Sequence, residues 1–443
     1  MSNEEAATGG SPDVAADQPA KARVTVPAPA GAVDVMTVTR DLLLHRLHEA
    51  AELEHTLLCS YLYAAFSLRE GESEGLTPDQ DEATTRWRRV IVGVAVEEMG
   101  HLAAVWNLTS ALGGSPRFGR ANFPIDPGLL PASLVVKLAP FGDALLQHCI
   151  YVERPLGSNE PEGVGFEPEL SYQRGATADR LTPMAVDYAT IGMLYTAIED
   201  NLRALVAAHG EDVVFAGDPQ LQLELKLQGA QPVTSLQSAL AALTCIVEQG
   251  EGAPGHVENS HFARFTKIRE ELRALRSTHP GFDPAFPVAT NPALRRPLRT
   301  TDRVWIEDEA ASRGVDIANA SYALMLRLLA YSYVIPRTNA EKGLVAGLAI
   351  ELMHAVMVLG VRAARLPAGP SHPGVNAGMS FTTLRDTAPL PPGLAARFYF
   401  MERFEEIAAA AASLDQSDPR AAAAARITAH VAQRANKGLA GIS

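Results

Sequence analysis

The chain has 443 residues, of which 47% are hydrophobic and 20% charged, a composition typical of a globular protein long enough for two or three domains. Its 51 acidic and 38 basic residues give a net charge of -13. Because nucleic-acid binding needs concentrated positive charge, we expect no nucleic-acid partner. The three cysteines are far apart and odd in number, so they predict no disulfide framework and favour a cytoplasmic location.

Residues 1–36 are rich in alanine, proline, glycine and acidic side chains, and we predict a disordered tail with no secretion signal. Apolar residues then recur every three or four positions over residues 39–69, which predicts a long helix whose inner face includes Glu54. A second helix is predicted over residues 84–112, where two glycines and a proline follow and end it.

The next part of the chain, residues 116–183, is rich in proline and glycine and contains one helical piece at residues 138–151. A third long helix is predicted at residues 184–209. A fourth is predicted at residues 234–250 and resumes at residues 258–277 after a glycine-rich break. Two helices, a long crossover and two more helices are the connectivity of a ferritin-like four-helix bundle.

We therefore predict an all-α fold in which residues 37–279 form a ferritin-like bundle, with the long crossover between helices 2 and 3. The prolines of residues 280–300 predict a linker, and residues 301–443 a C-terminal helical domain. The helices expected in that domain cover residues 317–334, 342–365, 394–414 and 421–435.

The most apolar stretch, residues 343–361, approaches the length of a membrane span but contains Glu351 and His354. Since charged groups at the middle of a bilayer are costly, we predict a buried core helix and no membrane partner. Glu351 and His354 have the Glu-x-x-His spacing of a metal site, but the preceding helix offers no carboxylate to complete one. We interpret them as a structural pair that is bonded internally.

Glu98 and His101 on the second helix stand three positions apart, so both side chains leave the face that carries the apolar residues. An ionised carboxylate inside a core is costly unless a cation meets it. The simpler explanation of a single Glu-x-x-His is a hydrogen-bonded pair in the core. The simpler explanation of Glu54 taken alone is a glutamate exposed to solvent. Together they favour a metal site. Glu97 is expected either to support this site or to be exposed.

The third and fourth helices should supply the remaining ligands. Glu199 is the best-placed carboxylate of the third helix. On the fourth, Glu251 lies between two glycines, and we predict it as a ligand together with His261. Glu248 and Glu258 are the alternatives to Glu251, since Glu258 has the Glu-x-x-His spacing to His261.

Carboxylates with imidazoles suit iron, and also manganese or zinc. We expect two iron ions bridged by carboxylates, with manganese and zinc as the alternatives. Tyr61 and Tyr195 lie on the same helix faces as the predicted ligands and are the candidate catalytic residues, near enough to hydrogen-bond the site or to be oxidised. An ordinary core role for these tyrosines is the simpler alternative.

Eight short segments occur in the same order as in a known family, with no missing element. They are residues 51–55 (AELEH), 61–68 (YLYAAFSL), 96–102 (VEEMGHL), 138–141 (LAPF), 153–155 (ERP), 191–195 (IGMLY), 249–252 (QGEG) and 260–265 (SHFARF). Over residues 37–275 the chain resembles the ferritin-like domain of the iminophenyl-pyruvate dimer synthase family.

Members of that family in violacein- and rebeccamycin-type pathways of secondary metabolism couple two imine molecules derived from oxidised tryptophan. The resemblance implies a metal-binding ferritin-like fold. The resemblance also implies that the metal ligands are Glu54, Glu98, His101, Glu251 and His261.

The leading hypothesis is a di-iron oxidoreductase or oxidative coupling enzyme for a small aromatic or amino-acid-derived substrate, with dioxygen or peroxide as a further reactant. One alternative is an iron- or peroxide-handling protein without an organic substrate. Another is a structural helical protein. The C-terminal helices either cap the bundle or form the interface of a homodimer.

Overall fold

The computed structural model describes residues 38–125, 130, 133–167, 188–250, 257, 259–297, 303–384 and 387–442. The predicted disordered tail, residues 1–36, lies outside the described residues. The rest of the chain belongs to one compact unit, Val35–Ser443.

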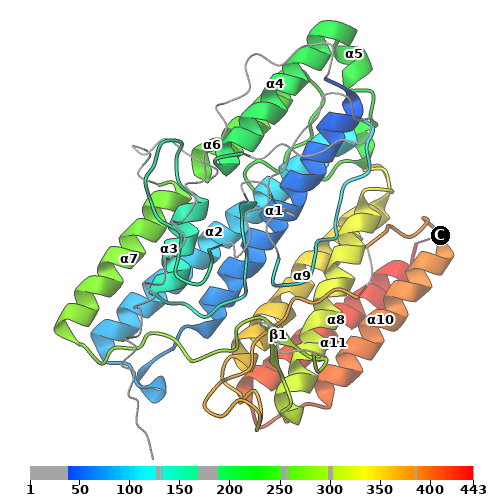
Figure 1. The fold of residues 1–443 in the computed structure, drawn as a ribbon. Coiled ribbons are helices and arrows are strands. Elements are labelled where there is room, and N and C mark those ends of the chain that lie inside the picture. The colour runs from blue at the N-terminus through cyan, green and yellow to red at the C-terminus, as the bar shows by residue number, and fades with distance from the viewer. Residues whose placement is uncertain are drawn as a thin grey trace, which may run out of the picture. The chain divides into compact units, whose positions relative to one another are not determined.

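Two long helices lie side by side at the centre of the fold (Figure 1). α1 covers Arg40–Ser67 and begins where the Thr39 side chain caps it. α2 covers Pro78–Ala111, and its start at Pro78 precedes the predicted start because Thr77 caps the helix and proline favours its first turn. Every side chain of residues 53–68 is buried, which requires neighbours on all sides of α1.

Four shorter helices, in two pairs, take the third and fourth positions of the bundle (Figure 1). α3 (Asp143–Val152) packs against α7 (His261–Thr278) beside one half of the α1–α2 pair, and α4 (Ile191–His209) packs against α6 (Leu236–Gln249) beside the other half. The short helical turns near them are α5 (Glu211–Val214) and η4 (Pro219–Leu221). The predicted long crossover follows α2 and contains α3.

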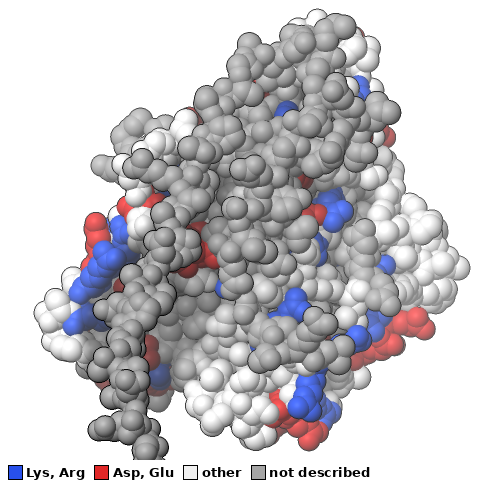
Figure 2. Space-filling model, in the orientation of Figure 1, with Lys and Arg blue, Asp and Glu red and all other residues white. Residues whose placement is uncertain are grey.

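The outer face of α7 carries both signs of charge. Figure 2 shows basic and acidic side chains interspersed along the edge where this helix lies. The exposed charged residues of α7 include Lys267, Glu270 and Arg273. The charged face is turned to solvent, while His261, Phe265 and Ile268 are buried. This amphipathic pattern leaves the buried side of α7 for the bundle.

The C-terminal helices cover the opposite side of α1 from the bundle (Figure 1). They are α8 (Glu309–Ser332), α9 (Ala340–Ala363), α10 (Leu394–Ala412) and α11 (Pro419–Ala440), preceded by the parallel two-residue strands β1 (Pro292–Ala293) and β2 (Val304–Trp305). One continuous cluster of buried apolar side chains includes members from α1, α2 and all four C-terminal helices. The predicted linker at residues 280–300 therefore does not separate two cores.

Helix α9 is long and apolar enough to cross a membrane by length and composition, and half of its most apolar window is buried. It packs against α8, α11 and α1. The predicted internal pairing of Glu351 with His354 is wrong. Glu351 forms an ion pair with Arg434 of α11, and the exposed His354 lies 3.2 Å from the Glu351 backbone oxygen through Nδ1.

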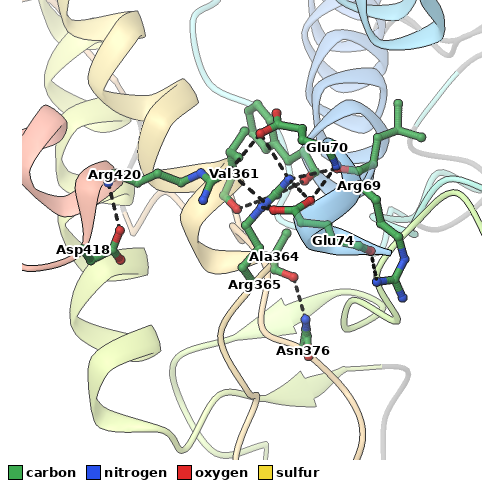
Figure 3. A network of polar contacts seen from close by, with 12 residues as sticks. Arg69, Glu70, Glu74, Val361, Ala364, Arg365, Asn376, Asp418 and Arg420 are labelled. Carbon is green, nitrogen blue, oxygen red and sulfur yellow. Dashed lines mark hydrogen bonds and ion pairs between the residues drawn. The ribbon is translucent and has the colours of Figure 1, made fainter. Parts of the chain in front are cut away.

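A polar network ties the α1–α2 connection to the C-terminal helices (Figure 3). Arg365, just beyond α9, donates to both carboxylate oxygens of Glu74 at 2.7 and 2.9 Å, and Glu74 belongs to the one-turn helix η2 (Glu72–Glu74). Arg365 also donates to the backbone oxygens of Phe66 and Leu68 at the end of α1. Bidentate pairing of this kind fixes geometry as well as charge. The network thus closes one end of the interface between α1 and the C-terminal helices.

We expect Arg365→Met to lower the free energy of unfolding by about 1–3 kcal/mol, because it removes the bidentate partner of Glu74 and the side-chain donor to the Phe66 carbonyl. The Leu68 carbonyl keeps its hydrogen bond from Arg88. Arg313→Met is the matched control, since Arg313 is largely exposed and its contacts, an ion pair with Glu309 and a hydrogen bond to Ser413, are exposed too. Its effect should stay below about 0.5 kcal/mol. Urea denaturation followed by circular dichroism measures both; equal effects would contradict the structural role of Arg365.

Candidate metal centre

The ends of four helices meet beside the middle of α1 and α2. α3 ends next to Glu153, α6 ends at Gln249, α7 begins at His261, and Tyr195 lies in the second turn of α4. Side chains at helix ends can converge on one point from several directions. Glu54 of α1 and the α2 residues Glu98 and His101 face the same point.

One group of metal-ligating atoms comes from α1 and α2. Atoms of Glu54, Glu98 and His101 all lie within 4.8 Å of one another. His101 Nδ1 is 2.9 Å from Glu98 Oε2 and 3.5 Å from Glu54 Oε2. All three side chains are fully buried, so no water competes with a bound ion from open solvent.

A second group shares Glu98 with the first. It consists of Glu98, Glu153 and His261, again with ligand atoms within 4.8 Å of one another. His261 Nδ1 is 3.1 Å from Glu98 Oε1 and 3.5 Å from Glu153 Oε1. The two oxygens of Glu98 therefore face different histidines, and the centroids of the His101 and His261 rings are 5.6 Å apart. Glu98 thus belongs to both groups of potential metal ligands.

Glu54 and Glu153, which each belong to one group only and are called the end carboxylates, accept hydrogen bonds from residues outside the two groups. Tyr195 donates its phenol proton to Glu54 Oε1, and Tyr61 donates to Glu153 Oε1. Both tyrosines are 1% exposed, so these bonds are shielded from water. Each bond leaves the second oxygen of its carboxylate without a hydrogen-bond partner.

The unpaired polar atoms show that the residues fit a metal. Glu54 Oε2, Glu98 Oε1, Glu153 Oε2 and His261 Nδ1 are buried and make no hydrogen bond. Burial of unpaired charged groups is costly, and a cation between them removes that cost. Three carboxylates and two imidazoles form a donor set that suits iron, manganese or zinc.

The pKa values of the site residues also indicate that the carboxylates need positive charge beside them. Burial and the Glu98 carboxylate raise the pKa of Glu54 to about 8. Burial also opposes ionisation of Glu98, but His261 and His101 hold its pKa well below the usual range. For His101, burial is outweighed by the neighbouring Glu54 and Glu98 carboxylates, which raise its pKa to about 10. Without a metal, protons therefore occupy the place of a cation.

The structure brings together four of the predicted ligands, Glu54, Glu98, His101 and His261. It places the predicted catalytic residues Tyr61 and Tyr195 one hydrogen bond away from the ligand groups. The predicted ligand Glu251 and its alternative Glu258 lie outside the described residues. The other alternative, Glu248, is exposed on α6.

Glu199 does not join the cluster. The buried stripe of α4 runs through Tyr195, Ile198 and Leu202, which leaves Glu199 at its edge. There it pairs with Arg203, with 2.7 Å between Glu199 Oε1 and Arg203 Nη2. The place expected for Glu199 is taken by Glu153.

Sequence reasoning missed Glu153 because it compared only the four long helices. The available signal was its position at the end of the single helical piece expected in the crossover. It also missed the contact of Gln249 Oε1 with His101 Nε2, at 3.0 Å. Glu97, expected to support the site or be exposed, lies 2.8 Å from His261 Nε2 through Oε2.

A family model described as ferritin-like matches residues 47–270, about half of the chain. The chain belongs to the ferritin-like family. The family assignment accounts for the bundle, its long crossover and the convergence of Glu and His side chains in its core.

Two curated relatives of this ferritin-like chain extend the similarity. Dichlorochromopyrrolate synthase of Lentzea aerocolonigenes is 28% identical over 84% of this chain and 39% of the relative. The 2-imino-3-(indol-3-yl)propanoate dimerase of Chromobacterium violaceum is 26% identical over 80% of this chain and 36% of the relative. They confirm the predicted resemblance to the imine-dimerising family. The chain spans about two fifths of the length of these relatives.

A solved structure of a ferritin-like protein from Caulobacter vibrioides is also similar to this chain. It is 17% identical, covers 74% of this chain and 95% of its own, and superposes with a TM-score of 0.47.

For the metal-free ferritin-like chain, we expect the free energy of unfolding to fall as the pH rises from about 6.5 to about 10. The folded state raises the pKa of His101 from 6.5 to about 10, so over this interval the folded chain holds a proton that the unfolded chain has lost. Glu54, with its pKa raised to about 8, acts in the same direction in the lower part of the interval.

Denaturation of the chelator-treated chain across this pH interval measures the slope. His101→Gln should make the slope shallower, because it removes the retained proton. His354→Gln is the matched control, since that ring is exposed and far from the site in sequence. A slope that His101→Gln leaves unchanged would contradict the stated protonation.

Proposed function

We propose that the chain is a di-metal carboxylate oxidoreductase, with two iron ions, that couples small aromatic molecules derived from amino acids. The observation that carries this proposal is Glu98, whose two oxygens face His101 and His261 in a dry core. A carboxylate so placed serves two ions at once. Manganese or zinc would fit the same donor atoms, but zinc has no redox chemistry, so only iron or manganese would serve an oxidation.

Two redox-active ions on either side of Glu98 would supply the capacity to take up a pair of electrons. The chain's own residues hold this centre in place. Tyr195 and Tyr61 each hydrogen-bond one oxygen of Glu54 and Glu153, which orients these carboxylates and would leave the other oxygen of each available to an ion. The apolar side chains around the site exclude water, which protects reactive species from side reactions.

The names of the two relatives support the substrate class. One relative is named as the dimerase of 2-imino-3-(indol-3-yl)propanoate, an aromatic imine, and the other as dichlorochromopyrrolate synthase. We propose an aromatic imine of this kind as the substrate. Coupling two such molecules forms one new bond and removes two electrons and two protons, with dioxygen or peroxide as the final oxidant.

After expression with ample iron, we expect the purified chain to contain two iron ions per chain. Glu98→Ala should lose both, because its carboxylate belongs to both groups, whereas Glu153→Ala should lose one. Glu199→Ala is the matched control and should keep both, since Glu199 pairs with Arg203 at the surface. Elemental analysis of the folded proteins measures the content. A wild-type chain without transition metal would refute the proposal.

We expect the iron-loaded chain to convert 2-imino-3-(indol-3-yl)propanoate, generated in the assay from tryptophan by an amino-acid oxidase, into a dimer lighter than two substrates by two hydrogens. Mass spectrometry detects the product. Glu98→Ala should abolish it and Glu199→Ala should not. Consumption of peroxide or oxidation of free iron, with no conversion of any aromatic imine, would favour the iron- and peroxide-handling alternative instead.

A further inference from the structure

The described ligands form two halves of the same composition. One half has Glu54, one oxygen of Glu98 and His101; the other has Glu153, the second oxygen of Glu98 and His261. Each histidine presents Nδ1 to its carboxylates. Each end carboxylate accepts one hydrogen bond from a buried tyrosine. Within the described residues, the atoms that would touch the two ions are therefore matched.

The halves differ on the far side of each imidazole. His101 Nε2 lies 3.0 Å from the side-chain oxygen of Gln249, the last residue of α6. His261 Nε2 lies 2.8 Å from the carboxylate oxygen Oε2 of Glu97. With Nδ1 directed at the metal, Nε2 carries the proton and donates it, to a neutral amide in the first case and to a carboxylate in the second.

The acceptor on the far nitrogen tunes the histidine as a ligand. A carboxylate that accepts this N–H bond makes the imidazole more electron-rich and holds its orientation, and such charge-assisted bonds are roughly twice as strong as neutral ones. A neutral amide as the acceptor makes the imidazole less electron-rich and holds its orientation less firmly.

Arg264 fixes the position of Glu97 from the other side. Arg264 Nη1 donates to Glu97 Oε1 at 3.1 Å, and Nη2 contacts Oε2. Arg264 and His261 are both in the first turn of α7, so the same helix end that delivers the histidine also delivers the arginine. The carboxylate is thereby held against the ring of His261, although Glu97 itself lies on the half-exposed side of α2.

We propose that the two metal positions are unequal, and that the position at His261 binds a divalent first-row transition ion first and more tightly than the position at His101. The inequality comes from Glu97 and Gln249, two positioning residues that touch no ion. This inference rests on the proposed di-metal function and adds an order of loading to it.

Anaerobic titration of the metal-free chain with Co2+ tests the proposal, with calorimetry for affinity and visible absorption for coordination. The wild-type chain should bind two ions in two separate steps. Glu97→Gln should weaken the tight step by about 10–100-fold and bring the two steps together. Gln249→Glu should strengthen the weak step. Crystals grown with one equivalent of Co2+ should show anomalous scattering beside His261 Nδ1, not beside His101.

Glu270→Gln is the matched control. It makes the same charge change as Glu97→Gln, is exposed on α7, and should leave both steps unchanged. If Glu97→Gln fails to fold by circular dichroism, Gln249→Glu decides the question by itself.

Two equal steps in the wild-type chain, or first occupancy beside His101, would overturn the order of loading and leave the di-metal proposal standing. A Gln249→Glu chain with an unchanged weak step would also overturn it. A wild-type chain that binds fewer than two Co2+ ions would overturn the di-metal proposal itself.

Discussion

The fold is organised around the burial of one carboxylate. Glu98 lies in the middle of a 34-residue helix with no exposed surface, and its two oxygens lie 2.9 and 3.1 Å from two different histidines. A carboxylate in that position is stable only when positive charge surrounds it. The bundle must therefore deliver cationic or metal-binding partners from two sides.

Interruptions in two helix positions of the bundle supply these partners. The third and fourth helix positions are each divided between two short helices, and the ends of these helices carry Glu153, Gln249 and His261 to the site. A single continuous helix presents its side chains to the site from one direction, since the side chains of a helix face repeat along its axis. Helix ends add side chains at the points where the backbone turns away. The arrangement gives two ligand groups that share Glu98.

The C-terminal helices make the site dry. They cover the side of α1 that faces away from the bundle, so residues 53–68 are buried on all sides, and Glu54 with them. The pairing of Arg365 with Glu74 secures one end of that interface. In such surroundings electrostatic interactions are stronger than in water. The difference between a carboxylate and an amide as the hydrogen-bond acceptor of a histidine therefore has a larger effect on that histidine.

The sequence by itself determined the helices, their order and the candidate ligands Glu54, Glu98, His101 and His261, because periodicity and Glu-x-x-His spacing are local properties of a helix. Only the tertiary structure decided that Glu153 completes the cluster and that Glu199 pairs with Arg203 at the surface. It also decided that the C-terminal helices share the core of the bundle. The physical reason is that packing of helix ends depends on contacts between residues far apart in the chain, which no local pattern records.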